Sequence, residues 1–167
     1  MRPLHAVVMG VMALAVVAAG CGGAIPSSNG GPATLKQDGQ YLVDGQGHSV
    51  YLFEKDAEGE SYCSGACAAV WPPLETSTAP RAGAGIQTGA LGTVKRDDGD
   101  MQVTYHGHPL YYYAADASTP GRTTGEDIDQ FGSSWYLVNT HGDPIEATSG
   151  SHSGSGGGSN GGGGGYG

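Results

Sequence analysis

The stretch GHPLYYYAAD (Gly107–Asp116) decides the fold, because the chain contains a second version of it. The related stretch GHSVYLFEKD (Gly47–Asp56) stands sixty positions earlier. It keeps the Gly, the His, a Tyr, another aromatic residue two positions after that Tyr, and the Asp in register. Internal similarity of this kind indicates a repeat architecture. The sequence therefore predicts two copies of one structural unit.

Around both copies, short alternating apolar runs are separated by clusters of Gly, Asp and Pro, and no sustained helical periodicity is present. This pattern predicts one all-β domain over residues 34–147. We expect strands at 41–43, 48–53, 94–96, 101–105, 110–114 and 135–139. The first two would form a hairpin across Asp44–Gly47, and the next two a hairpin across Asp97–Asp100, since Gly residues there permit tight turns.

A third, partial copy ends the domain, because Tyr136–Ile145 resembles Tyr41–Val50 but stops before any aromatic-Asp element. We interpret it as a further hairpin that completes or closes the sheet arrangement. Together these patterns predict tandem-repeat hairpins packed around one core, in a small sandwich or barrel.

Within the repeated strand, alternate side chains face opposite sides of the sheet. Tyr51 and Phe53 therefore share one face, as do Tyr111 and Tyr113. The intervening Leu52 and Tyr112 are also apolar or aromatic. Apolar character on both faces predicts strands that are covered on both sides.

Asp56 and Asp116 follow the repeated strands, where each chain segment enters a turn. An Asp at such a position accepts hydrogen bonds from nearby backbone N–H groups and so fixes the turn. This structural role is the favoured interpretation. The alternative is that the Tyr hydroxyls and the Asp carboxylates converge on a ligand or a cation.

Residues 1–20 have the pattern of a bacterial export signal, with Arg2 before an apolar run, Ala6–Ala19, that is too short to span a bilayer. The following Ala18-Ala19-Gly20-Cys21 resembles a lipobox, at which the signal is cut and Cys21 is acylated, for example with palmitate. The uncharged, Gly/Ser/Pro-rich composition of residues 21–33 predicts a flexible tether, and the Gly/Ser-rich composition of residues 148–167 predicts a disordered tail. We therefore expect an extracytoplasmic protein that is anchored to the cell membrane as a lipoprotein.

The chain is acidic, with 16 Asp and Glu against 7 Lys and Arg and a net charge of −9 with His neutral. This balance argues against a nucleic-acid partner and against electrostatic attraction to anionic lipids. The expected contact with the membrane is therefore the lipid on Cys21.

Cys63 and Cys67 are predicted to form a disulfide, because the exported chain reaches a compartment where disulfides persist and their spacing suits a short bridge. The alternative is a metal or redox site in which the two thiolates act with a His. The histidines considered for such a site are His48, His106, His108 and His141. The favoured interpretation needs no cofactor.

Trp71 precedes two prolines, and we expect it to pack in the core beside a rigid extended segment. The alternative for Trp71 is an exposed stacking platform for a sugar.

The twin Y-x-[FWY]-x-x-D elements behind a lipobox resemble the bacterial lipoprotein family called the secreted repeat of unknown function. The other stretches that carry the resemblance are Cys63–Cys67, Trp71–Leu74, Val103–Tyr105 and Trp135–Tyr136. The resemblance implies an extracytoplasmic location and a repeat architecture, and it brings no activity.

No nucleophile–base pair, zinc-helix motif or phosphate loop stands in the sequence, so we expect a protein that is not an enzyme. The leading hypothesis is a non-catalytic binding or structural module whose partner is an envelope protein or a cell-wall glycan. The alternative hypothesis is the metal or redox protein that uses Cys63, Cys67 and a His. The oligomeric state stays open.

Overall fold

The structure is a computed structural model that describes residues 31–116 and 119–146. The predicted signal, Cys21, the tether up to residue 30 and the predicted tail lie outside the described residues. In the described part, no helix is long and apolar enough to cross a membrane.

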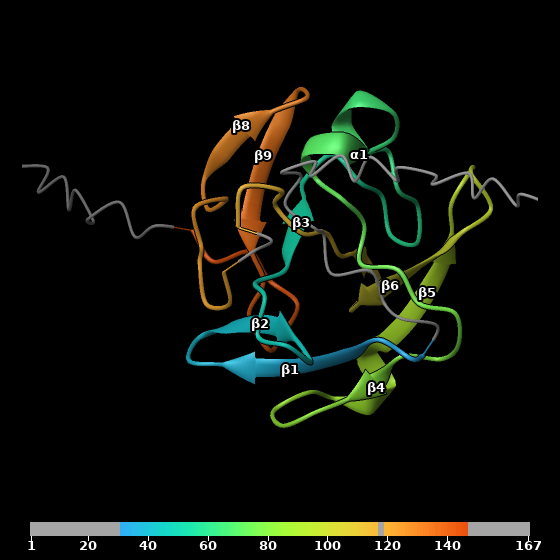
Figure 1. Cartoon of the computed structure of the whole chain (residues 1–167), viewed down its shortest axis with the longest axis vertical. Helices are drawn as coiled ribbons and strands as arrows, with labels where there is room; N and C mark the ends of the chain where they lie inside the picture. Colours follow the sequence, from blue (N-terminus) through green and yellow to red (C-terminus); the bar gives the residue numbers. More distant parts are fainter. Residues whose placement is uncertain (1–30, 117–118, 147–167) are drawn as a thin grey trace, which may run out of the picture.

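The described chain is almost entirely strand and loop, which confirms the all-β prediction (Figure 1). Its strands are β1 (Thr34–Asp38), β2 (Tyr41–Asp44), β3 (Tyr51–Phe53), β4 (Arg81–Ala82), β5 (Leu91–Lys95), β6 (Met101–Tyr105), β7 (His108–Pro109), β8 (Ile128–Gln130) and β9 (Ser133–Leu137). A short helix α1 (Ala66–Val70) follows Cys63, and a 3₁₀ turn η1 (Thr88–Ala90) precedes β5.

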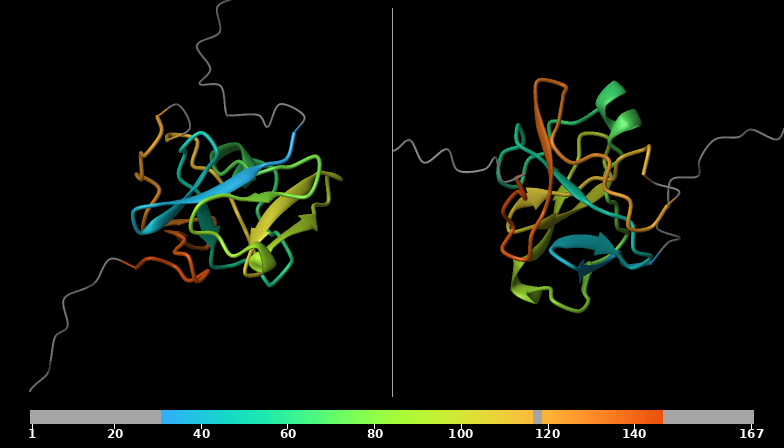
Figure 2. Two further views of the ribbon diagram at one scale, coloured as in Figure 1. Left: turned by 90° about the horizontal axis from the view of Figure 1, so that it is seen from below. Right: turned by 90° about the vertical axis from the view of Figure 1, so that its left-hand side faces the viewer.

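The strands form three small sheets with the orders β2-β1-β4, β3-β9-β8 and β5-β6-β7. None of these sheets closes into a barrel in the part of the chain that the structure describes. β3 lies near the middle of the molecule, between the β1–β2 hairpin, the β8–β9 hairpin and the β5–β6 hairpin (Figure 1). Figure 2 shows the same arrangement from two further sides.

The predicted hairpin across Asp97–Asp100 is present, because β5 pairs with β6 from Lys95 opposite Met101 to Leu91 opposite Tyr105. The predicted hairpin across Asp44–Gly47 is only partly correct. β2 pairs along its length with β1, which the sequence did not reveal, and a single bridge joins Val43 to Ser49.

The expected strand at 110–114 is wrong as a regular strand, since β7 ends at Pro109 and Tyr111 makes only isolated bridges to Tyr51 and Pro73. The physical reason is that the segment opposite, residues 70–74, contains two prolines. Tyr112 donates its backbone N–H to the carbonyl of Pro72 at 2.7 Å, but Pro72 and Pro73 have no N–H to return. A regular two-sided ladder therefore cannot form there.

The alternating faces of the repeated strand are both buried, as predicted, but they enter two separate clusters instead of the one core that we expected. Val50 and Leu52 belong to an aliphatic core, which also contains Leu110 and Tyr112. The opposite faces enter an aromatic core, whose buried members are Tyr51, Phe53, Cys63, Cys67, Trp71, Tyr111, Trp135 and Leu137. Each repeat thus contributes to both cores through one extended segment.

The further hairpin that we expected in the third partial copy is partly correct, like the first: one bridge joins Val138 to Pro144, and Asn139 and Ile145 donate their backbone N–H groups to the carbonyls of Asp143 and Leu137 at 3.0 and 2.8 Å. The similarity of this copy to the first is structural. Oδ1 of Asn139 accepts backbone hydrogen bonds at 2.7 and 3.1 Å from the residues two and four positions later, and Oδ1 of Asp44 does the same at 2.9 and 2.8 Å. The sequence echo therefore encodes one type of turn twice.

The two repeats, residues 34–74 and 91–138, interlock. The central segment of each repeat lies along the last segment of the other: β3 pairs with β9, and residues 110–114 run along residues 70–74. The central segments meet at Tyr51 and Tyr111, which donate their backbone N–H groups to each other's carbonyls at 2.9 Å. An approximate twofold axis therefore passes between these two tyrosines.

Candidate functional site

A stack of four aromatic rings fills the aromatic core. Trp71 and Trp135, one from each repeat, lie face to face with ring centroids 4.0 Å apart and planes 5° from parallel. Phe53 stacks on the outer side of Trp135 at 4.1 Å, and Tyr113 stacks on the outer side of Trp71 at 4.4 Å. Each ring of the first repeat thus has a counterpart from the second, as the twofold axis requires.

Both tryptophans are 0% exposed, so Trp71 is a core residue as predicted and offers no platform to a sugar. Their indole N–H groups are nonetheless satisfied. Trp71 Nε1 donates to Oε1 of Gln130 at 3.0 Å, and Trp135 Nε1 donates to the backbone carbonyl of Gln130 at 3.1 Å. One residue of β8 therefore caps both indoles, which removes the cost of burying two unpaired donors.

The repeated Tyr and Asp residues form a clasp, which consists of Tyr51 with Asp116 and Tyr111 with Asp56. The Tyr51 hydroxyl donates to Oδ2 of Asp116, and the Tyr111 hydroxyl donates to Oδ2 of Asp56, each at 2.6 Å. In both pairs the hydroxyl and the carboxylate come from different repeats. The two Y-x-[FWY]-x-x-D motifs therefore bind each other.

A third Tyr–Asp hydrogen bond between the repeats does not use the motif positions. In it, the Tyr112 hydroxyl donates to Oδ2 of Asp44 at 2.9 Å. Asp44 is 2% exposed and accepts four hydrogen bonds, including one from Nδ1 of His48 at 3.1 Å. The turn aspartate of the first repeat thus also holds the second repeat.

Both motif aspartates also fix turns, in agreement with the structural interpretation. Oδ1 of Asp56 accepts the backbone N–H of Tyr62 at 2.7 Å. Asp116 accepts the hydroxyl of Thr124 and the backbone N–H of Gly125. Each carboxylate is therefore occupied by a turn on one side and by the tyrosine of the other repeat.

Burial is the main reason why the pKa values of Tyr51, Tyr111 and Tyr112 lie well above the usual value near 10, and the adjacent carboxylates raise them further. These hydroxyls stay protonated and act as hydrogen-bond donors. Burial also raises the pKa of Asp56 to about 6, although the hydrogen bonds from Tyr111 and Tyr62 and the charge of Arg96 act in the opposite direction. Asp56 therefore changes its charge in mildly acidic solution.

The predicted disulfide between Cys63 and Cys67 is present, with Cα atoms 5.2 Å apart. Both cysteines are buried, and in this oxidised form they offer no thiolate to a metal. Of the histidines that the sequence suggested, His48 faces Asp44, and His108 pairs with Tyr105 in the β6–β7 ladder. Among the described residues, no group of three or more His, Cys, Asp and Glu is placed to hold a metal ion.

A polar cleft of about 340 Å³ lies between the loop 59–64 of the first repeat and residues 94–97 of the second. We call it the 59–97 cleft. Its lining comprises Gly59, Glu60, Ser61, Tyr62, Ser64, Val94, Lys95, Arg96 and Asp97. The cleft adjoins the disulfide, in the segment between Asp56 and Trp71 where the two repeats differ in length.

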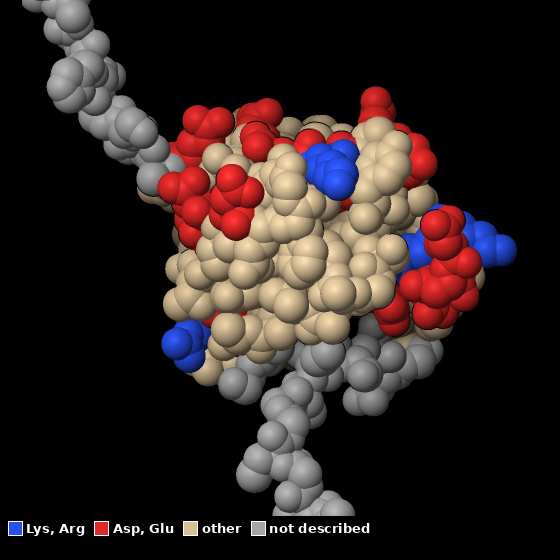
Figure 3. Space-filling model, turned by 90° about the horizontal axis from the view of Figure 1, so that it is seen from above, with Lys and Arg blue, Asp and Glu red and all other residues tan. Residues whose placement is uncertain are grey.

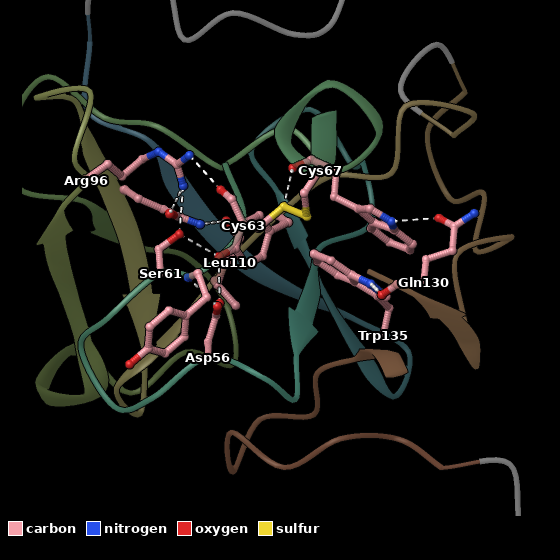
Figure 4. Close-up of a disulfide and its surroundings, with 12 residues drawn as sticks. Asp56, Ser61, Cys63, Cys67, Arg96, Leu110, Gln130 and Trp135 are labelled. Atoms are coloured by element: carbon pink, nitrogen blue, oxygen red, sulfur yellow. Dashed lines mark hydrogen bonds between the residues drawn. A yellow bond between two sulfur atoms is a disulfide. The ribbon is translucent and has the colours of Figure 1, made fainter. Parts of the chain in front are cut away.

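Arg96 forms the floor of this cleft and is only 7% exposed. Its guanidinium donates at 2.8 Å to the hydroxyl of Ser61, to Oε1 of Gln102 and to the backbone carbonyl of Cys63 (Figure 4). It also pairs with Asp98 at 3.2 Å. Four partners from three segments therefore hold the floor rigid.

The floor of the cleft is connected to the clasp by consecutive hydrogen bonds. Arg96 donates to Ser61, Ser61 lies 2.7 Å from the Tyr111 hydroxyl, and Tyr111 donates to Asp56. Because Tyr111 gives its only proton to Asp56, Ser61 is the donor in the middle bond. In the second repeat Asp116 instead faces Arg122, whose side chain is half exposed, at 3.6 Å. The two Tyr–Asp pairs of the clasp thus have the same geometry, but the arginines beside them differ. Arg96 is buried and reaches its pair through Ser61, whereas Arg122 is half exposed and faces Asp116 directly.

On the face shown in Figure 3, charged side chains gather in a few separate groups with a broad uncharged area between them. At one edge, acidic and basic side chains lie together. This face is therefore not covered by charge of a single sign.

Residues 33–75 and 92–139 each match the model of a family described as a secreted repeat of unknown function, and together they cover more than half of the chain. The chain belongs to this family. The two matches nearly coincide with the two interlocked halves, so one secreted repeat is one half of the twofold unit. Membership implies an extracytoplasmic location. No curated protein and no solved structure matches the chain.

Several residues of this site were not found from the sequence. Arg96 ends the expected strand 94–96, directly before the turn Asp97–Asp100, and nothing in the sequence marks it as buried. Gln102 and Gln130 stand in strands without any motif. The correspondence of Trp71 with Trp135 was also missed. Fifteen positions separate Asp56 from Trp71, whereas nineteen separate Asp116 from Trp135, so the two tryptophans fall out of register. Aligning the repeats with a gap after the Asp would have found this pair.

Proposed function

We propose that this chain is a lipid-anchored, non-catalytic binding module of the cell envelope. The observation that carries the proposal is the clasp. The Tyr hydroxyls and Asp carboxylates that could have served as acids, bases or ligands are bonded to each other across the repeats at 2.6 Å. These groups hold the fold together, and a separate set of polar groups that is open to an external molecule lines the 59–97 cleft.

Anchoring is supported by the apolar run before Cys21, by the small residues at 18–20 and by the family's secreted character. Several acyl chains on one cysteine, at ~0.8 kcal/mol per buried CH₂, hold a protein at a membrane without a basic patch. Intact-mass measurement of protein extracted from producing membranes should give a chain that begins at Cys21 and carries acyl groups. The Cys21→Ser variant should appear in the soluble fraction, and its retention in the membrane would contradict the anchoring proposal.

The binding role is tested by cross-linking on intact cells. We expect Lys95→Glu, at the cleft, to reduce capture of an envelope component, whereas Lys36→Glu, on β1, should leave capture unchanged. Equal capture by both variants would mean that the partner binds at a site other than the 59–97 cleft. Turnover of a substrate that is lost in Lys95→Glu would contradict the non-catalytic role.

The alternative metal or redox function needs Cys63 and Cys67 in their reduced form. Thiol titration of the denatured protein with and without reductant distinguishes the two functions. We expect no free thiol from this pair before reduction and two after it, while two free thiols at the start would favour the alternative.

A further inference from the structure

We infer that the 59–97 cleft binds a neutral sugar chain, with Tyr62 as its stacking platform. This inference rests on the proposed binding function and names the chemistry of the ligand. The cleft lies in the size range of small-molecule sites, roughly 300–1,000 Å³.

Tyr62 is one of two large apolar side chains that stand exposed in the described chain, at 48%. Two hydrogen bonds restrain it: the backbone N–H donates to Asp56 at 2.7 Å, and the hydroxyl donates to Glu60 at 2.8 Å. An aromatic ring that is already held in place loses little entropy when a ligand stacks on it. A sugar ring fits such a platform because it has an apolar C–H face and a polar edge.

The charges of the lining favour an uncharged ligand. Glu60 and Asp97 offset Lys95 and Arg96, so the lining has no excess of either sign. The guanidinium of Arg96 is also committed to Asp98 and to three uncharged partners, and it offers no free cation to a phosphate or carboxylate. A polyanionic ligand would meet Lys95 as the one uncommitted cation of the lining, beside the carboxylates of Glu60 and Asp97.

The remaining polar groups suit hydroxyl-rich ligands. Ser64 and Lys95 are exposed at the cleft and can donate, and the carboxylates of Glu60 and Asp97 can accept. Hydroxyl groups donate and accept, so a sugar can use both kinds of group in the lining. An apolar ligand would leave them unpaired.

The cleft is rigid, which favours binding to a preformed site. The disulfide joins Cys63 to α1, and the carbonyl of Cys63 accepts from Arg96, so the loop is tied to both neighbours. Rigidity lowers the entropic cost of association. For an extracytoplasmic protein, a neutral segment of a cell-envelope glycan has this chemistry.

Calorimetric titration of the mature protein tests the inference, in a detergent without a sugar headgroup. The probes are tetrasaccharides of β-1,4-linked N-acetylglucosamine, β-1,4-linked glucose and α-1,4-linked glucose, with a short polyphosphate and a hexaglutamate peptide as charged comparisons. We expect at least one neutral tetrasaccharide to bind and both charged probes to fail. Tyr62→Ala should weaken binding by about tenfold or more, as truncation of a central aromatic contact does.

The matched control is Phe131→Ala, which removes the other exposed large apolar side chain, in the β8–β9 turn. It should leave the affinity unchanged. The inference is overturned if no neutral probe binds at millimolar concentration, if a charged probe binds more tightly, or if Tyr62→Ala has no larger effect than the control. If Lys95→Glu still abolishes capture of an envelope protein while all sugars fail, the proposed binding function stands and only the sugar is wrong.

Discussion

Replacing Tyr51 by Phe removes one oxygen atom from the clasp and leaves the aromatic ring in place. That oxygen donates to Asp116 at 2.6 Å and accepts the backbone N–H of Gly125 at 3.2 Å. Asp116 is 3% exposed, so water cannot replace the lost donor. A hydrogen bond to a charged group contributes about 1.5–3 kcal/mol, and we expect Tyr51→Phe to lower the free energy of unfolding by about 2–3 kcal/mol.

Two further variants calibrate this value. Tyr111→Phe should cost less, about 1–2 kcal/mol, because Asp56 is only partly buried and keeps the N–H of Tyr62. Tyr113→Phe should change the free energy of unfolding by less than about 0.5 kcal/mol. Tyr113 contributes its ring to the stack, and its counterpart in the first repeat is Phe53.

Urea denaturation followed by tryptophan fluorescence measures all three variants, with an unchanged slope showing that only stability has changed. Since about 1 kcal/mol shifts the melting temperature by roughly 4–8 °C in a small domain, Tyr51→Phe should melt roughly 8–24 °C lower. The reasoning is refuted if Tyr51→Phe and Tyr113→Phe are equally stable.

A double-mutant cycle separates the crossed arrangement from one within each repeat. Tyr51→Phe should couple to Asp116→Asn by about 1 kcal/mol or more, and to Asp56→Asn by close to zero. The reverse ranking would mean that each tyrosine bonds to the aspartate of its own repeat.

Three other predictions concern the disulfide, the stack and Asp56. Replacing Cys63 and Cys67 together by Ser should cost about 2 kcal/mol in urea denaturation, because the bridge closes only a short loop; a loss above about 4 kcal/mol would mean that the bridge holds more than the cleft loop. Iodide should not quench native tryptophan fluorescence, since both indoles are fully buried, and Trp71→Ala should cost about 3–5 kcal/mol; quenching in the native state would contradict the stack. The raised pKa of Asp56 adds stability that is complete below pH 4 and is lost as the pH rises through about 6. Asp56→Asn should therefore show a flatter stability profile than the unmodified protein between pH 4 and 7, and parallel profiles would contradict the raised pKa.

The features predictable from the sequence are those that neighbouring residues determine. The alternation in YLF and YYY placed the two faces of each extended segment correctly, because side-chain direction in extended backbone depends only on local geometry. The Asp97–Asp100 turn and the Cys63–Cys67 bridge followed from short spacings in the same way.

The features that escaped prediction depend on contacts between distant segments. β1 has the sequence TLKQD, which carries little apolar signal, and it is a strand because β2 and β4 flank it. The exchange of last segments between repeats is likewise invisible in either copy alone. The burial of Arg96 was missed because its partners Ser61, Cys63 and Gln102 lie in other segments.

The most direct test of the interlocked repeats is a cut between them. A protease site inserted between Thr88 and Gly89, both exposed in η1, would cut the chain into one half that carries the first repeat and one that carries the second. After cleavage the halves should stay associated as a native 1:1 complex. Each half separated in denaturant should stay unfolded alone and regain native tryptophan fluorescence only when its partner is added. A half that refolds alone, with native fluorescence and cooperative unfolding, would contradict the interlocked architecture.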